Sequence, residues 1–196
     1  MVPLAMIRHG PTAWNSEKRL QGRTDVPLSE EGRETVLSWR VPEELKDYQW
    51  VASPLSRAVE TARLLGASVP AIEPRLREMH YGNWEGRSLP ELRQSLGEVM
   101  AENEARGVDF QPDGGERPRD VQERLSSWLA DLGRSAAPTV AVSHHGVLRA
   151  LYALATGWNM VDPLPEKFQW GAMQCFHVSS SGEVSVDRIN VSIEAT

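Results

Sequence analysis

The stretch LAMIRHGPTAWN, residues 4–15, decides how this sequence folds. It begins with four apolar residues of the kind that form a buried β-strand, and it changes at once to the polar and turn-forming letters RHGP. A second stretch, TVAVSHHG at residues 139–146, has the same order: an apolar run, a polar residue, a histidine and a nearby glycine. Two strands that both end in an imidazole predict a polar site where those strands end.

Short strand-like runs alternate with helical patterns along the 196 residues, which is typical of βαβ units around a mostly parallel sheet and favours a single domain. Strands are predicted over residues 2–8, 49–53, 139–143, 174–179 and 184–189, and the letters SSSG between the last two predict a hairpin at one edge. Helices are predicted over residues 29–40, 55–65, 120–132 and 147–156. Residues 101–119 are polar and rich in glycine and proline, so we expect an exposed loop there that serves as a lid or binding segment.

The composition argues against several classes of protein. The net charge of −6, without a basic tail or stripe, disfavours a nucleic-acid-binding protein. The single cysteine, Cys175, offers no intrachain disulfide and is typical of a reducing compartment. We find neither a signal-peptide pattern nor an apolar run of membrane-spanning length. We therefore expect a cytoplasmic protein with a small-molecule partner, with no nucleic acid and no membrane, acting as a monomer or a homodimer.

Three predicted strands end next to residues that can bind an anion. His9 and His144 follow two of them, and in open α/β sheets a ligand binds beyond the carboxyl ends of the strands. Arg57 follows the third strand, in the first turn of a helix, where free N–H groups favour anions. Together with Arg8 and the amide of Asn15, these residues predict a pocket for an anion, most simply phosphate.

Each of these residues, taken alone, also has an ordinary structural explanation. A single histidine after a strand is most often a polar cap, and a single arginine often pairs with an acid at the surface. Gly10 is expected to let the backbone turn sharply and approach a ligand closely. The convergence of three strand ends favours the anion site over these separate explanations.

Other phosphate and hydrolase chemistries lack their motifs. Cys175 has Ser181, not arginine, six positions later, and the chain contains no GxxxxGK[ST], HExxH, GxSxG or GxGxxG pattern. His144 and His145 are adjacent, and in an extended backbone they would face opposite ways and could not share one metal. We therefore expect neither a metal nor a cofactor.

Five stretches carry a resemblance to a known family: RHGPTAWN, LQGRTDVPLSEEGRE, SPLSRAVETA, LREMHYGNWEG and VSHHGVLRAL. They lie in the same order, between residue 7 and about residue 152, as in the phosphoglycerate-mutase-like branch (branch 1) of the histidine phosphatase superfamily, which the chain resembles. The resemblance implies a three-layer α/β/α sandwich with a mostly parallel sheet. It also implies a metal-independent phosphatase that hydrolyses small phosphate monoesters through a phosphohistidine intermediate.

The motif positions imply roles for single residues. His9 matches the family's nucleophile, and Glu78, in LREMHYG, matches its proton donor. The positions that hold the phosphoryl group are matched by Arg8, Arg57 and His144. His145 is a departure, because the family usually has Gly or Asn there. Contacts with the substrate are expected from Asn15, Thr12, Gly10, Arg23, Tyr81 and His145.

The implied chemistry requires particular protonation states. Protonated His144 would stabilise the negative charge of the transferring phosphoryl group together with the arginines. Burial and a neighbouring phosphate dianion would raise the pKa of Glu78, so that it could act as an acid near neutral pH. The alternative for Glu78 is a surface ion pair with Arg75 or Arg77.

Three functions fit this pattern. Hydrolysis is favoured, because QGRTD resembles the phosphatase relatives and the mutases have a longer insertion before the second histidine. A phosphoglycerate-type mutase comes second, because HYG at residues 80–82 resembles the mutase spelling. An inactive phosphate-binding or regulatory module comes third, since every matched catalytic position is occupied. Specificity is expected to lie in residues 101–119, with Trp84 or Trp14 at the rim of the pocket.

Overall fold

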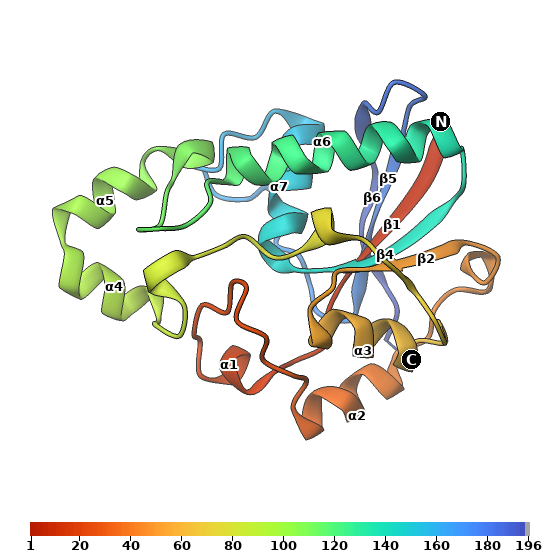
Figure 1. Ribbon diagram of the computed structural model, residues 1–196, viewed down its shortest axis with the longest axis horizontal. Helices are drawn as coiled ribbons and strands as arrows, with labels where there is room; N and C mark the ends of the chain where they lie inside the picture. The colour runs from red at the N-terminus through yellow and green to blue at the C-terminus, as the bar shows by residue number, and fades with distance from the viewer. Residues whose placement is uncertain (195–196) are drawn as a thin grey trace.

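The computed structural model describes residues 1–194 and contains one six-stranded sheet covered by helices (Figure 1). The strands are β1 (Val2–Arg8), β2 (Gln49–Ala52), β3 (Ala71–Ile72), β4 (Thr139–Ser143), β5 (Ala172–Val178) and β6 (Val184–Ser192). The α-helices are α1 (Ala13–Ser16), α2 (Glu30–Ser38), α3 (Ser56–Leu64), α4 (Leu89–Leu96), α5 (Glu98–Glu104), α6 (Pro118–Ser135) and α7 (His145–Thr156). Short 3₁₀ turns lie at Glu43–Leu45, Pro74–Leu76, Gly82–Trp84 and Gly107–Asp109.

The order of the strands is β3-β2-β4-β1-β5-β6. Strands β3, β2, β4 and β1 run parallel, whereas β5 and β6 form an antiparallel hairpin at one edge. All five predicted strands are present; β2 ends one residue earlier than predicted, and the ends of the last two strands are shifted by up to three residues. The two-residue strand β3 was not predicted, because two exposed residues carry no alternating pattern. The mostly parallel α/β sheet is thus confirmed.

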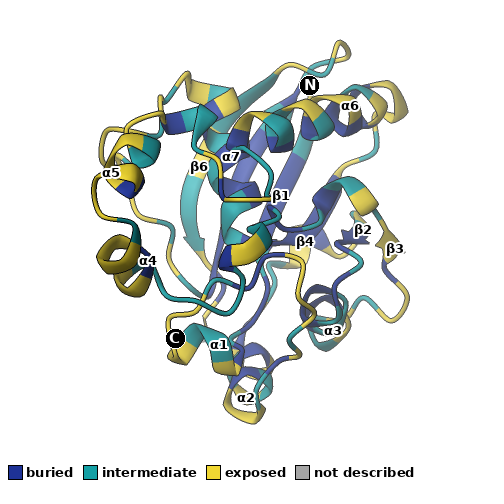
Figure 2. Ribbon diagram, turned by 60° about the vertical axis from the view of Figure 1, so that its left-hand side comes forward, coloured by how far each residue is buried: buried dark blue, intermediate teal, exposed yellow. Residues whose placement is uncertain are grey.

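The side chains of the central strands point alternately to the two faces of the sheet, and each face has its own hydrophobic core. In β1, Leu4 and Met6 face one side of the sheet and pack with the buried side chains of α6 and α7. Ala5 and Ile7 face the other side and pack with residues of α2 and α3. Because successive side chains of a strand point to opposite faces, a strand buried on both sides has to be apolar throughout. The three-layer sandwich is confirmed, with buried strands between helices whose outer faces are exposed (Figure 2).

Helices α6 and α7 begin two residues earlier than the sequence pattern predicts. Pro118 occupies the first turn of α6, where its missing N–H costs nothing, and the Asp120 carboxylate accepts a hydrogen bond from the Arg117 amide at 2.8 Å. The capping residue pair is therefore Arg117 and Asp120, which places the start of the helix before Asp120. Helix α7 begins at His145 and ends before Gly157, whose φ of 74° is the left-handed geometry that glycine favours at helix ends.

The expectation of an exposed loop over residues 101–119 is partly wrong. Helix α5 continues to residue 104, a 3₁₀ turn follows, and residues 113–116 are tied to residues 80–83 by backbone hydrogen bonds of 2.9 Å. Trp84, Leu92 and Met100 form a small third core under α4 and α5, which stand away from the sheet at the left of Figure 1. Trp84 is 6% exposed and belongs to this core, and the place of Trp84 or Trp14 at the rim of the substrate pocket stays a prediction.

None of the helices within residues 1–194 has both the length and the apolar character required to cross a membrane.

Candidate active site

His9 and His144 meet at the carboxyl ends of the two central strands. The parallel register pairs Arg8 with Ser143, and the His9 amide donates to the Ser143 carbonyl at 2.9 Å. The next residue of each strand is therefore delivered to the same point. The two rings lie with their centroids 5.1 Å apart and their planes tilted by 57°, and both side chains are buried. The sequence predicts that both histidines lie at this edge of the sheet, and in the structure their rings are neighbours.

A single hydrogen bond fixes the tautomer of His9. Its Nδ1 lies 2.7 Å from the carbonyl oxygen of Gly10, which can only accept, so Nδ1 carries the hydrogen. Burial, and then the nearby cations Arg8 and Arg57, hold the pKa of His9 well below its ordinary value. The ring is neutral at physiological pH, and the lone pair remains on Nε2.

His144 is held from the other strand end and by the opposite ring nitrogen. Its Nε2 lies 2.7 Å from the Ser53 hydroxyl, which follows β2 and also accepts the Leu55 amide at 3.4 Å. The Ser53 hydroxyl has no other acceptor among the described residues, so it donates to Nε2 and the ring hydrogen stays on Nδ1, a buried atom with no hydrogen-bond partner within residues 1–194. Burial and the Arg57 charge lower the pKa of His144 well below 6.5, so the ring is neutral in the protein without a ligand, and its protonation against a phosphoryl group stays a prediction.

Arg57 lies at the base of the site and is fully buried. Its guanidinium donates to the Thr24 carbonyl at 2.9 Å and to the Gly22 carbonyl at 2.8 Å, while its buried Nε has no partner in the described chain. The loop that supplies these carbonyls is organised by Glu85, whose carboxylate accepts the Arg23 and Thr24 amides, both at 2.9 Å. Burial lowers the pKa of Arg57, which nevertheless stays charged and presents a fixed cation.

Arg8 packs against a tryptophan that sequence reasoning missed. The central carbon of its guanidinium lies 3.8 Å from the centroid of the Trp170 ring, a cation–π contact. The same ring meets His9 edge-on at 6.2 Å. Burial lowers the pKa of Arg8 to about 10, so the cation persists at neutral pH. Trp170 comes close because β5, which begins two residues later, is antiparallel to β1; no local pattern announces this pairing.

Glu78 is buried beside the histidines and takes no part in a surface ion pair. Its two carboxylate oxygens accept the amides of Met79 at 2.8 Å and Gly146 at 3.2 Å. Burial raises the pKa of Glu78, and the amide hydrogen bonds and the charges of the nearby arginines oppose that rise. Arg75 instead pairs with Glu73 at 2.8 Å and with Asp131 at 2.6 Å. The buried position is the one that an acid catalyst needs.

Thr12 and Asn15 are engaged with each other. Thr12 caps α1, and the Asn15 side-chain oxygen accepts both the Thr12 amide and the Thr12 hydroxyl at 3.0 Å. The predicted contacts of these two residues with phosphate stay predictions.

Gly10 is needed for a reason other than the predicted sharp turn. Its φ is not in the left-handed region, but a Cβ there would lie 2.3 Å from Cγ2 of Val36 in α2. Close packing of α2 on the residues after His9 explains the glycine.

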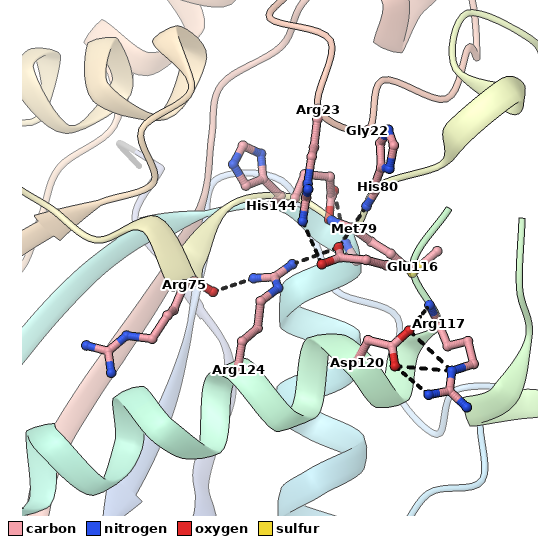
Figure 3. A network of polar contacts seen from close by, with 12 residues as sticks. Gly22, Arg23, Arg75, Met79, His80, Glu116, Arg117, Asp120, Arg124 and His144 are labelled. Atoms are coloured by element: carbon pink, nitrogen blue, oxygen red, sulfur yellow. Dashed lines mark hydrogen bonds and ion pairs between the residues drawn. The ribbon is translucent and has the colours of Figure 1, made fainter. Parts of the chain in front are cut away.

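Arg23 lies at the exposed rim and pairs with Glu116 at 2.6 Å. The second oxygen of the same carboxylate accepts the His80 amide at 2.9 Å and lies 3.4 Å from Arg124 of α6 (Figure 3). Arg124 also donates to the Arg75 carbonyl. Glu116 thus joins the rim loop, the segment after Glu78 and α6. Direct contact of Arg23 with a substrate stays a prediction.

Tyr81 and His145 line a neighbouring cavity of about 380 Å³. His145 is the first residue of α7 and His144 is its extended cap, and of the two only His145 lines this cavity. Burial lowers the pKa of His145 to about 3, which makes its ring neutral. Tyr81 and His145, both predicted to contact the substrate, therefore line the same cavity, and His145 directly follows His144 in the chain.

Comparisons with known proteins identify chains that are similar over most of this sequence. A family model described as the histidine phosphatase superfamily (branch 1) matches residues 4–190. The chain is 36% identical over 169 residues to a protein of Mycolicibacterium vanbaalenii named glucosyl-3-phosphoglycerate phosphatase, covering 79% of this chain and 74% of the relative. It is 34% identical over 166 residues to 2,3-bisphosphoglycerate-dependent phosphoglycerate mutase 2 of Gloeobacter violaceus, covering 77% and 74%. A solved mycobacterial glucosyl-3-phosphoglycerate phosphatase in complex with VO3 has a TM-score of 0.82 at 27% identity, covering 98% of this chain and 100% of that chain.

Proposed function

Because the chain belongs to branch 1 of the histidine phosphatase superfamily, we propose that His9 carries the phosphoryl group during hydrolysis of small phosphate monoesters. The protein is a histidine phosphatase: relatives in sequence and in structure carry that activity in their names. The observation that supports His9 most strongly is its hydrogen bond to Gly10, which leaves Nε2 unprotonated on a ring whose centroid lies 5.1 Å from that of His144. The substrate is a small phosphorylated metabolite.

Binding of the phosphoryl group is the first step. Arg8 and Arg57 supply two fixed positive charges, and the Nδ1 hydrogen of His144 is a free donor in the same buried space. In a water-poor pocket such charges act strongly on the three equatorial oxygens of a transferring phosphoryl group. A bound dianion raises the pKa of His144, so this ring gains its proton with the ligand and not before.

Transfer and hydrolysis are two in-line displacements in which His9 lies on one side of phosphorus, and the leaving substrate oxygen and later the attacking water lie on the other. The lone pair on Nε2 of His9 attacks phosphorus, the bond from phosphorus to the substrate oxygen breaks, and Glu78 gives its proton to the leaving oxygen. Water then attacks the phosphohistidine, Glu78 takes up a proton from it, and inorganic phosphate leaves with the ring restored. The raised pKa of Glu78 suits both directions of this proton transfer.

Hydrolysis of 4-nitrophenyl phosphate tests the role of His9. We expect phosphate release by the wild type without added metal and in the presence of a chelator, and none by His9→Ala. His177→Ala is the matched control, since His177 pairs with Pro3 at the opposite end of β1 and should leave the rate unchanged. Turnover by His9→Ala at the wild-type rate would remove His9 from this role.

A mutase is the second candidate, and the mutase-named relative supports it. A mutase returns the phosphoryl group from the enzyme to another hydroxyl of the substrate and releases little phosphate. Incubation of a phosphorylated hydroxy acid with the enzyme, followed by analysis of both free phosphate and positional isomers, separates the two. We expect free phosphate as the main product, and isomerisation in its place would favour the mutase.

A further inference from the structure

The Arg57 guanidinium is held by two backbone carbonyls of one loop. It donates to the Gly22 carbonyl at 2.8 Å and to the Thr24 carbonyl at 2.9 Å. Both carbonyls belong to the rim loop, residues 21–25, which lies between α1 and α2 and contains no helix or strand. The place of this cation in the site therefore depends on the conformation of the rim loop.

Glu85 fixes that conformation with a single carboxylate. Its Oε1 accepts the Arg23 amide at 2.9 Å, and its Oε2 accepts the Thr24 amide at 2.9 Å and the Thr24 hydroxyl at 2.5 Å. A fourth and longer hydrogen bond, of 3.2 Å, comes to Oε1 from the Tyr81 amide. Burial opposes the charge of Glu85, but these hydrogen bonds, that of the Thr24 hydroxyl foremost, hold its pKa below the ordinary value. The carboxylate is therefore ionised at neutral pH, although only 12% of the side chain is exposed.

The peptide group between Gly22 and Arg23 connects this carboxylate with the cation. Its carbonyl accepts from Arg57 at 2.8 Å, and its N–H donates to Glu85 at 2.9 Å. A trans peptide group is planar and its N–H and C=O point in opposite directions, so a hydrogen bond at one end fixes the direction of the other end. A negative charge at the N–H also polarises the group and makes its carbonyl a stronger acceptor. Glu85 thus acts on Arg57 across two hydrogen bonds.

Gly22 shows how closely the rim loop and the carboxylate fit together. Its φ of 56° lies in the left-handed region that glycine favours, and a Cβ there would lie 2.1 Å from Oε1 of Glu85. A side chain at this position would displace the carboxylate from the peptide group that it binds. Gly22 is therefore required for the contact between Glu85 and the loop that holds Arg57.

We propose that Glu85 is a positioning residue for phosphoryl transfer, because its carboxylate, acting through the peptide group between Gly22 and Arg23, holds the Arg57 guanidinium against the phosphoryl group. This role deepens the phosphatase function proposed above and rests on it. Catalysis of phosphoryl transfer depends mostly on charges that are fixed before the substrate arrives. A carboxylate that acts through another residue can then change the rate strongly, since a displacement of about 1 Å can cost about 10²-fold.

Glu85→Gln tests this role. The carboxamide keeps the size of the side chain, but its NH₂ group cannot accept a hydrogen bond from the Arg23 or the Thr24 amide. We expect kcat/KM to fall about 10- to 100-fold, by the same factor for 4-nitrophenyl phosphate and for the alkyl ester glycerol 3-phosphate, because Arg57 binds the phosphoryl group that both share. A loss confined to the alkyl ester would assign the effect to Glu78 and overturn the proposal.

Glu91→Gln is the matched control. The Glu91 carboxylate also accepts a backbone amide, that of Ser88 at 2.8 Å, but it caps α4 and not the rim loop, so this variant should keep the wild-type rate. Thr24→Val removes only the hydroxyl that donates to Glu85. It should show a smaller loss than Glu85→Gln in the same direction, and it gives the answer if Glu85→Gln does not fold. Wild-type rates in these two variants of the loop contact would overturn the proposal.

A double-mutant cycle with Arg57→Ala separates positioning from a general effect on stability. The readout is the dissociation constant of inorganic phosphate, followed by ³¹P NMR, which requires no turnover. We expect Glu85→Gln to raise this constant about 10-fold in the wild type but less than about twofold in Arg57→Ala. Equal increases in the two backgrounds would show that Glu85 does not act through Arg57. A wild type that hydrolyses no phosphate monoester would reject the phosphatase function, whereas the cycle would still decide the role of Glu85.

Discussion

Burial and one or two hydrogen bonds set the protonation state of each ionisable residue in this site. His9 and His144 use opposite ring nitrogens for their anchors, Nδ1 to a carbonyl at 2.7 Å and Nε2 to a hydroxyl at 2.7 Å. The first leaves a nucleophilic lone pair, and the second leaves a donor. Glu78 differs from both, because burial favours its protonated form. One buried pocket therefore holds a neutral base, a neutral donor and an acid.

Glu78→Gln tests the acid. The amide keeps the size and one acceptor oxygen but has no proton to give to a leaving alkoxide, so we expect turnover of alkyl phosphates to fall about 10²- to 10⁴-fold. An aryl phosphate, whose leaving group needs no proton, should lose much less. Steady-state rates on the two substrate types provide the measurement, and equal losses on both would point to a defect in folding or binding.

His145→Asn tests the burial of a neutral imidazole. The native pKa is about 3 and the ordinary value is 6.5, so the folded state binds its proton less tightly than the unfolded chain. The contribution of the neutral His145 ring to the free energy of unfolding is therefore fully present above pH 6.5 and is lost progressively as the pH falls toward 3. Between pH 7.5 and pH 5 the wild type should lose about 2 kcal/mol of unfolding free energy relative to His145→Asn. Urea unfolding across this range provides the values, and parallel curves for the two proteins would contradict the assignment.

The secondary-structure elements that carry the site residues pack closely against one another at glycines. Helix α2 approaches the turn after His9 so tightly that a Cβ on Gly32 would lie 2.0 Å from the Pro11 carbonyl, and one on Gly10 would lie 2.3 Å from Val36. The Ser29 amide, at the cap of α2, donates to the same Pro11 carbonyl at 3.1 Å. The helix thus holds the carbonyl-bearing turn that orients the nucleophile.

Gly10→Ala tests this packing. Overpacking of a filled site costs about 1–3 kcal/mol, and the added methyl should also push the turn away from His9 and lower turnover. Val36→Ala removes the obstructing methyl groups. We therefore expect the double variant to be more stable than the sum of the two single losses predicts, by about 0.5–3 kcal/mol in a double-mutant cycle. Additive losses in urea unfolding would show that the two side chains do not meet.

The sequence predicts those elements whose pattern is local. The apolar runs of β1 and β4 and the caps of α2 and α7 are visible in it, because they depend on neighbouring residues. Helix α4 and most of α5 were missed, since their apolar residues face a small third core and are few. Gly10 was predicted for turn geometry, and the structure gives it a packing role that depends on Val36.

At the scale of the whole molecule, the site is a meeting of segments that are distant in sequence. His9 and His144 come from adjacent strands, Arg57 from the helix after β2, and Glu78 from the link that follows β3. Sequence reasoning could predict this convergence, because parallel strands end at one edge. It could have found Ser53, which ends a predicted strand. The contact of Trp170 with Arg8 depends on long-range packing that no local pattern carries.

The most direct test of the account is the position of phosphate on the enzyme during turnover. The wild type should be mixed with substrate, quenched in alkali within the first turnover and mapped by mass spectrometry, with ³¹P NMR of the quenched protein to separate the two ring nitrogens. We predict an acid-labile phosphate on Nε2 of His9, because Nδ1 is bonded to the Gly10 carbonyl. Phosphate on His144, on Nδ1 of His9, or on no histidine during active turnover would contradict the account.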